Sequence, residues 1–184
     1  MKYIVLLRGI NISGKNKISM NELKIELEKK YNNVMTYLNS GNIILESFEI
    51  KKNITNQILK IINDKFNLKI PIHILTFDEL NDIFENIPSW IKMKDKEFYN
   101  NIIFIIPPEN YINVYNQLGK PSENIEMVKE YNNVIFWSYN LKNYKKSNWW
   151  IKTASTSIKD SITIRTVNTM KRVLELCSEK NSRM

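Results

Sequence analysis

The spacing of apolar and polar residues divides the first half of the chain into short strands and helices. Residues 2–7 (KYIVLL) would place apolar side chains on both faces of a strand, which indicates a central strand covered on both sides. Ser19 and Glu22 form a capping box that starts a helix, and Thr76 and Glu79 form a second one. The order is β-α-β-β-α-β followed by a helix, which is the ferredoxin-like order. The remaining elements are predicted as strands over 34–38, 42–46 and 70–75 and a helix over 51–66.

The second half repeats this pattern less regularly. Residues 88–100 are polar and lack periodicity, so we place a boundary there. We therefore expect an α+β fold of two subdomains: a ferredoxin-like βαββαβ one over 1–90, and a related one over 91–184 with a C-terminal helix. Whether the halves are copies is left open. The predicted elements are strands over 101–106, 125–128 and 134–139, a short segment over 161–165, and helices over 109–118, 141–152 and 167–178.

Polar residues follow the first strand and form the turn between the second and third strands. In a βαββαβ sheet the first two strands are parallel, so the carboxyl end of the first lies at the same edge as that turn. The helix that begins at Ser19 opens at this edge too. We expect the following residues to lie near one another there: Arg8, Asn11, Lys15 and Lys17 of the loop, and Asn39, Ser40 and Asn42 of the turn.

This arrangement predicts an anion site. A helix N-terminus offers unpaired N–H groups and a partial positive charge, and glycines such as Gly9 and Gly14 allow the backbone to approach a ligand closely. Arg8, Lys15 and Lys17 would add cationic side chains. The alternative is an ordinary solvated loop, with Arg8 in a surface ion pair and Asn42 satisfying the turn backbone.

The spacing Gly9-x-x-x-x-Gly14-Lys15 nearly fits the phosphate-binding P-loop. Asn16 stands where that motif needs Ser or Thr to hold magnesium, and the helix begins too late. These departures argue against a nucleotide-hydrolysing P-loop, and a looser phosphate cradle is left open. His73 is the only histidine, so a cluster of histidine metal ligands is excluded, and we expect neither a metal nor a cofactor.

Two stretches carry a resemblance to a known family. LLRGIN-x-x-G-K-N-K-x-x-M-x-x-L followed by T-Y-L-N-S-G-N resembles the bacterial family catalogued as domain of unknown function 1697, and TIRTVNT resembles its closing pattern. Ser13 stands where the family often has Gly, and Thr166-Val167 where it usually reads Asn-Trp. The family brings no established activity. The matched polar positions are Arg8, Gly9, Asn11, Gly14, Thr36, Tyr37, Ser40, Gly41, Asn42, Arg165, Asn168 and Thr169.

The resemblance implies that both polar clusters matter, and that Arg165 and Asn168 approach the first cluster from the second half. Together with Lys15 and Lys17, the matched positions form our predicted ligand site, with Arg8 and Lys15 as anion ligands and Asn11, Ser40 and Asn42 orienting the ligand. The sequence assigns no reaction, so whether the protein is an enzyme, and which residues would be catalytic, is left open.

Composition bounds the location and the partners. The net charge of +8 suits a phosphate-bearing ligand or nucleic acid. All but four of the 27 basic residues are Lys, however, and such an excess also arises from A/T-rich codons. No apolar run is long enough for a membrane span, no signal peptide is evident, and Cys177 is the lone cysteine. We expect a cytoplasmic protein that does not partner with a membrane and is a monomer or homodimer.

Two other function classes compete with the ligand site. Trp149 and Trp150, with dispersed Lys residues, would suit a nucleic-acid-binding module in which bases stack on aromatic rings. A protein-interaction domain would use the polar motifs only to secure turns.

Overall fold

The computed structural model describes residues 1–154, 158 and 160–179. The first half contains the sheet β2-β3-β1-β4, in which all pairings are antiparallel. This is the ferredoxin-like order that the sequence predicted. Pro71 precedes β4, which lies at the edge of this sheet. The elements are β1 (Lys2–Leu7), α1 (Met20–Glu28), β2 (Asn32–Tyr37), β3 (Asn42–Glu46), α2 (Lys51–Phe66), β4 (Ile72–Thr76) and α3 (Phe77–Glu85).

The second half forms the sheet β6-β7-β5-β8, again wholly antiparallel. Its segment near residue 161 is a full strand, so this half also completes βαββαβ. The expected helix over 141–152 is instead a short 3₁₀ turn followed by α5. The elements are β5 (Phe98–Ile105), α4 (Tyr111–Leu118), β6 (Glu126–Tyr131), β7 (Val134–Asn140), the 3₁₀ turn η1 (Tyr144–Lys146), α5 (Asn148–Thr153), β8 (Ile162–Thr166) and α6 (Val167–Glu179).

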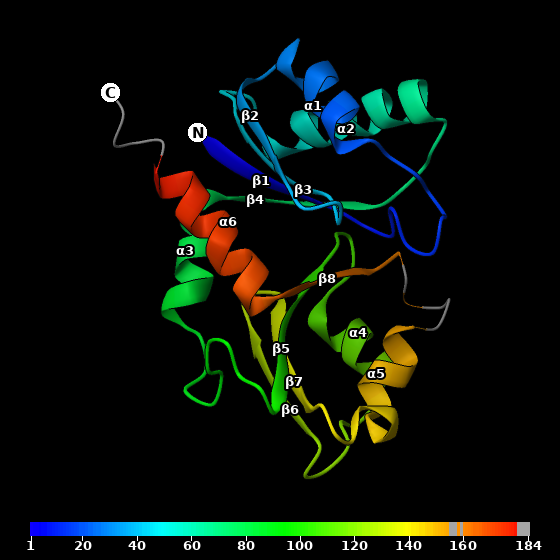
Figure 1. The fold of residues 1–184 in the computed structure, drawn as a ribbon, viewed down its shortest axis with the longest axis vertical. Helices are drawn as coiled ribbons and strands as arrows, with labels where there is room; N and C mark the ends of the chain where they lie inside the picture. Colours follow the sequence, from blue (N-terminus) through cyan, green and yellow to red (C-terminus); the bar gives the residue numbers. More distant parts are fainter. Residues whose placement is uncertain (155–157, 159, 180–184) are drawn as a thin grey trace. The chain divides into compact units, whose positions relative to one another are not determined.

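Each sheet has its own apolar core beneath a pair of helices. In Figure 1, α1 and α2 lie side by side over the first sheet, and α4 and α5 lie together over the second. Leu23 and Leu27 of α1 and Ile58 of α2 are completely buried in the first core. Trp149 of α5 is completely buried in the second core. These apolar faces hold each pair of helices on its sheet.

The chain divides into two compact units. One contains Met1–Asn81 and the stretch from Val173 onward, and the other contains Asp82–Arg172. Helices α3 and α6 each continue across the division. The division into subdomains at 1–90 and 91–184 stays a prediction.

A buried carboxylate organises the second half, and no pattern in the sequence predicted it. Glu126 on β6 is 9% exposed. Its carboxylate accepts hydrogen bonds from the indole of Trp137 (3.0 Å), the Ser147 hydroxyl (2.6 Å) and the backbone N–H of Trp149 (3.1 Å). Because these donors include the first turn of α5, the carboxylate anchors a helix too short to be stable alone.

Candidate functional site: the loop before α1

The loop between β1 and α1 is a folded structure of its own. Gly9, Asn11, Ser13, Gly14 and Asn16 all have positive φ angles, between 47° and 77°. Positive φ at both Ser13 and Gly14 is typical of a type I′ turn, and the turn is closed by a hydrogen bond from Lys15 N–H to the Ile12 carbonyl (2.9 Å). Backbone contacts thus hold the loop in one shape.

Asn11 connects this loop to the turn between β2 and β3. Its amide group donates to the carbonyl oxygens of Ile18 (3.0 Å) and Asn39 (2.9 Å). Its side-chain oxygen accepts from the Ile18 N–H (2.9 Å). The predicted meeting of loop and turn is therefore confirmed, and one side chain makes the connection.

The turn packs tightly against the end of β1. Leu7 N–H donates to the Gly41 carbonyl (2.8 Å), and Gly41 has φ +80°. A Cβ added at Gly41 would lie 2.6 Å from Leu7 Cβ, so only glycine fits without movement. Asn42 is completely buried, and its amide donates to the Tyr37 carbonyl (2.9 Å) and the Ser40 hydroxyl (3.1 Å). Asn42 thus fastens the turn.

An open hollow of about 570 Å³ lies between the loop and the start of α1. Ser19 caps the helix and accepts from the Glu22 N–H (3.3 Å), whereas the N–H groups of Met20 and Asn21 meet no acceptor among the described residues. The hollow thus contains the helix start that the sequence placed at this edge. The lining residues are Asn11, Gly14, Lys17, Ile18, Ser19, Met20, Asn21 and Asn39.

The structure places only part of the predicted set in this lining. Arg8 is half-buried and its backbone N–H donates to the Pro71 carbonyl (3.0 Å). Lys15 is exposed on the type I′ turn, and Thr36 and Tyr37 are half-buried at the end of β2. Sequence reasoning did not assign Asn21 to the ligand site, although its place inside the Ser19–Glu22 capping box was the available signal.

The matched residues of the second half form a different local structure. The Thr166 hydroxyl accepts from the Thr169 N–H (3.1 Å) and so caps α6. Arg165 is 8% exposed, and its guanidinium donates to the Thr163 hydroxyl and the Ile164 carbonyl, both at 2.9 Å. Asn168 lines a hollow of about 240 Å³ together with β5 residues. The implied approach of Arg165 and Asn168 to the loop stays a prediction.

Titratable groups elsewhere offer few reactive candidates. Burial raises the pKa of the Cys177 thiol to about 11, against a smaller opposing effect of Lys2, so this thiol is neutral at pH 7. Across the described residues, no three His, Cys, Asp or Glu side chains converge as a metal site. No helix within the same residues is long and apolar enough to cross a bilayer.

Comparison with known proteins identifies the family. Residues 1–136 match the family described as "Protein of unknown function (DUF1697)". The chain belongs to the DUF1697 family. The match contains the loop, the turn and the whole first sheet, whereas the closing motif at 163–169 lies beyond it.

Two further comparisons bear on the fold. The solved structure of SP0830, a conserved bacterial protein from Streptococcus pneumoniae, is similar with a TM-score of 0.83 and 24% sequence identity. The similarity covers 95% of this chain and 97% of that one, so the two proteins share the complete α+β fold. No curated protein matches.

Proposed function

We propose that this protein binds a small anionic ligand, such as a phosphate-bearing one, in the hollow between the Gly9–Ile18 loop and the start of α1. One observation supports this most strongly: Lys17 and the open first turn of α1 line the same hollow. Asn11 holds that hollow against the β2–β3 turn. A pre-formed hollow lowers the ordering cost of binding.

The electrostatics of the hollow favour negative charge. The N–H groups of Met20 and Asn21 carry the positive end of the α1 dipole. Lys17 adds a full positive charge. Gly14 also lines the hollow and has no side chain that would fill it. The volume, about 570 Å³, is in the range of small-molecule sites. The proposal is one of binding and assigns no reaction. It retains the expected cytoplasmic location, which the lone, buried Cys177 supports.

Asn21→Asp tests the site without weakening the helix. An acid in the first turn of a helix is favourable to the helix, so the variant should fold at least as well as the parent. The added charge should nevertheless repel an anion, and we expect affinity for inorganic phosphate, pyrophosphate or ATP to fall about tenfold in calorimetry. Unchanged affinity for every anion that binds would refute the location.

Lys17→Gln should act in the same direction, by about three- to tenfold. Lys30→Gln is the matched control, because Lys30 is an exposed lysine beyond the far end of α1 and its loss changes net charge equally. If both variants weaken binding alike, the effect comes from overall charge and the hollow is not the site.

A further inference from the structure

A second surface, on the other unit, combines an exposed tryptophan and a half-buried tyrosine with lysines. Trp150 on α5 is 37% exposed, and its ring meets the Tyr144 ring edge to face, with centroids 4.9 Å apart at 77°. Tyr144 therefore packs against the Trp150 indole. Trp149, its neighbour in sequence, is completely buried and donates its indole N–H to the Gly119 carbonyl (2.8 Å). Trp149 thus anchors the helix and cannot stack on a base, which corrects the predicted Trp149–Trp150 pair.

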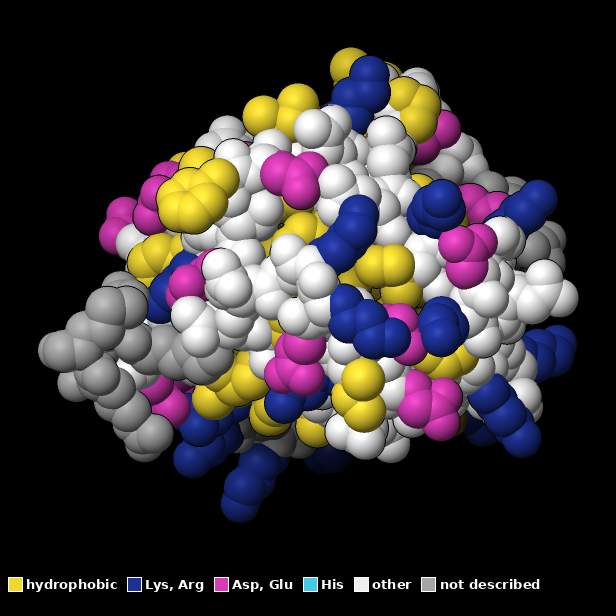
Figure 2. All heavy atoms as spheres, turned by 90° about the horizontal axis from the view of Figure 1, so that it is seen from above, with side chains coloured by type: hydrophobic (Ala, Val, Ile, Leu, Met, Phe, Trp, Pro, Cys, Tyr) yellow, Lys and Arg dark blue, Asp and Glu magenta, His cyan; other side chains and the backbone are white. Residues whose placement is uncertain are grey.

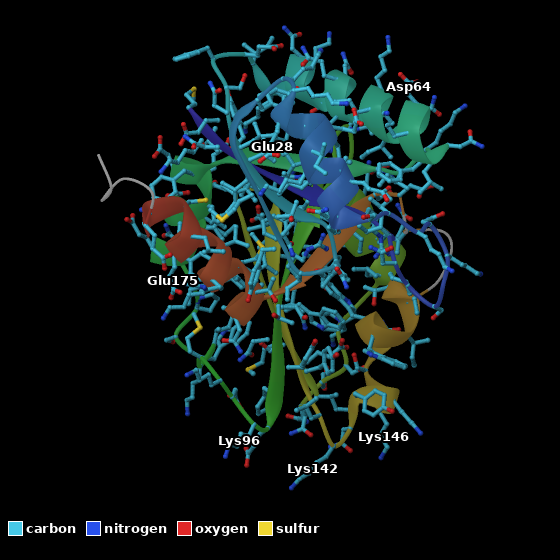
Figure 3. All side chains as sticks on the ribbon, turned by 45° about the horizontal axis from the view of Figure 1, so that its top comes forward. Glu28, Asp64, Lys96, Lys142, Lys146 and Glu175 are labelled. Carbon is cyan, nitrogen blue, oxygen red and sulfur yellow. The ribbon has the colours of Figure 1, made fainter. Side chains whose placement is uncertain are left out.

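Lysines accompany the two rings on this surface. Lys142, Lys145 and Lys146 belong to the segment that leads into α5, and the Lys145 ammonium lies 5.9 Å from the Tyr144 ring centroid. Lys96 comes from a neighbouring segment, since the Leu141 N–H donates to the Glu97 carbonyl (2.9 Å). Figure 3 shows Lys96, Lys142 and Lys146 projecting outward from the same end of the second unit. We call these four lysines with Tyr144 and Trp150 the basic–aromatic face.

The charge of this face is not neutralised locally. Lys142, Lys145 and Lys146 have no carboxylate partner within ion-pair distance among the described residues. Two of the three nearby acids have other partners: Asp95 accepts backbone N–H groups of its own turn, and Glu123 pairs with Lys120 (2.7 Å). The third, Glu97, is exposed. On the face seen in Figure 2, by contrast, Lys and Arg are interspersed with Asp and Glu, so no comparable single-sign cluster forms there.

We propose that the basic–aromatic face binds single-stranded nucleic acid. Phosphates would pair with the lysines, and one base would stack on the Trp150 indole, since every base has a face that stacks on an aromatic ring. A duplex hides its bases and would gain only the lysine contacts. An anionic membrane would also attract lysines, but α5 spans only six residues and offers little apolar area for insertion.

The lysine contribution is measured by the salt dependence of binding. With four phosphate contacts, log K for a fluorescent oligo-dT or oligo-U should fall with log salt with a slope of roughly −3. Replacing Lys142, Lys145 and Lys146 together by Gln should make that slope shallower by about 2. The control replaces Lys52, Lys60 and Lys69, three exposed lysines of the first unit, by Gln, and should leave the slope unchanged.

The stacking contribution is measured at Trp150. Trp150→Ala should lower affinity about 5- to 150-fold, and Trp150→Phe should recover most of it because the smaller ring still stacks. Phe48→Ala is the control for non-specific binding of the oligonucleotide to exposed aromatic rings, since Phe48 is fully exposed in the first unit. Binding of an unlabelled oligonucleotide should also quench the tryptophan fluorescence of the parent protein, and it should quench that of Trp150→Phe much less.

Three results would overturn the proposal. These are no binding of either oligonucleotide at low salt, equal losses in the two triple-lysine variants, or tighter binding to phosphatidylserine vesicles that depends on Trp150. Duplex binding at the same affinity as single strands would also exclude the stacking role. Lys17→Gln should not change oligonucleotide binding, so failure of the small-anion site and failure of this face are separable.

Discussion

The two halves have the same strand order, and the central strands β1 and β5 pair with their two neighbours in the same register, but the halves differ at particular positions. Ile4 of β1 pairs with Leu75 of β4, and at the equivalent place Ile102 of β5 pairs with Arg165 of β8. Leu6 pairs with Asn42 of β3, where Phe104 pairs with Val134 of β7. Each half therefore carries a buried polar residue where the other has an aliphatic one.

This difference separates what the fold needs from what is added to it. At both positions the other half has an aliphatic residue, so the sheet does not require a polar side chain there. Burying a polar side chain costs free energy, so the presence of Asn42 and Arg165 needs a further explanation. For Asn42 the reason is visible, because its amide fastens the β2–β3 turn. The second half needs no such residue, because a tight turn at Asn132 and Asn133, both with positive φ, joins its strands.

The connections differ in the same sense. In the first half, residues 8–19 form a folded loop with an adjoining hollow, whereas in the second half residues 106–110 lead directly into α4. The second crossover helix, in turn, is reduced from sixteen residues in α2 to six in α5 and depends on Glu126. The first half is elaborated at its loop and the second at a surface helix, which is where the two proposed binding surfaces lie.

The largest effect should follow loss of the second half's anchor. Glu126→Ala leaves several buried donors without an acceptor, and we expect the free energy of unfolding to fall by about 4 kcal/mol. Hydrogen exchange should show the opening around α5 and β6. Glu123→Ala, an exposed acid nearby, should cost under about 0.5 kcal/mol. A small cost for Glu126→Ala would mean that α5 is held by its apolar contacts alone.

The next effect should be at the first half's turn. Gly41→Ala combines a positive φ with a close approach to Leu7 Cβ, and we expect a loss of about 3 kcal/mol in urea unfolding. Gly9→Ala is the matched control: its φ is +67° but nothing lies within 4 Å of the added methyl group, so it should cost about 1 kcal/mol. Equal costs would show that steric fit at Gly41 does not matter.

Asn42→Val gives the first half the residue that the second half uses. Although valine is more apolar, the Tyr37 carbonyl and the Ser40 hydroxyl lose a donor, and we expect a loss of about 2 kcal/mol. If the variant is instead more stable than the parent, the turn does not need Asn42 and its burial must serve another purpose. Thermal and urea unfolding give the answer.

The smallest effect concerns the helix caps that follow the last strand of each sheet. Thr76 caps α3 with Glu79, and Thr166 caps α6 with Thr169. Partial burial raises the Glu79 pKa, but hydrogen bonds from Lys51 and the Thr76 backbone outweigh it, and the net pKa lies below the ordinary 4.5. The resulting stabilisation is complete above the unfolded pKa and is lost as pH falls through the folded one.

Glu79→Gln should therefore reduce stability by about 0.5 kcal/mol at pH 7 and by less at pH 3, because the group is half-exposed and screened. The Thr166–Thr169 cap contains no titratable group. The protection factors of the amides at the start of α6, measured by hydrogen exchange relative to the intrinsic rates, should therefore show no such pH dependence. A loss that is the same at both pH values would contradict the assignment.

Local sequence signals were enough for most of the fold. The Thr76–Glu79 capping box, the cap at Ser19, the apolar strand 2–7 and the strand order all depend on neighbours in sequence or on general topology, and the structure confirms them. Of the Ser19–Glu22 box, the structure shows only the hydrogen bond that the Ser19 hydroxyl accepts from the Glu22 N–H. The site was predicted less completely. Topology placed the loop beside the turn, but the lining includes Asn21 of α1 and leaves out Lys15. The direction of the Lys15 side chain depends on the loop's five left-handed residues, which sequence periodicity does not predict.

By itself, the sequence determined the two-sheet α+β architecture and the sheet edge at which polar segments meet, because hydrophobic periodicity and caps act over a few residues. Only the tertiary structure decided that Glu126 is a buried anchor, that Trp149 points inward while Trp150 stays exposed, and that Asn11 joins the loop to the turn. Those outcomes depend on which distant donors and rings occupy the space around each side chain, and this information is not contained in any local stretch.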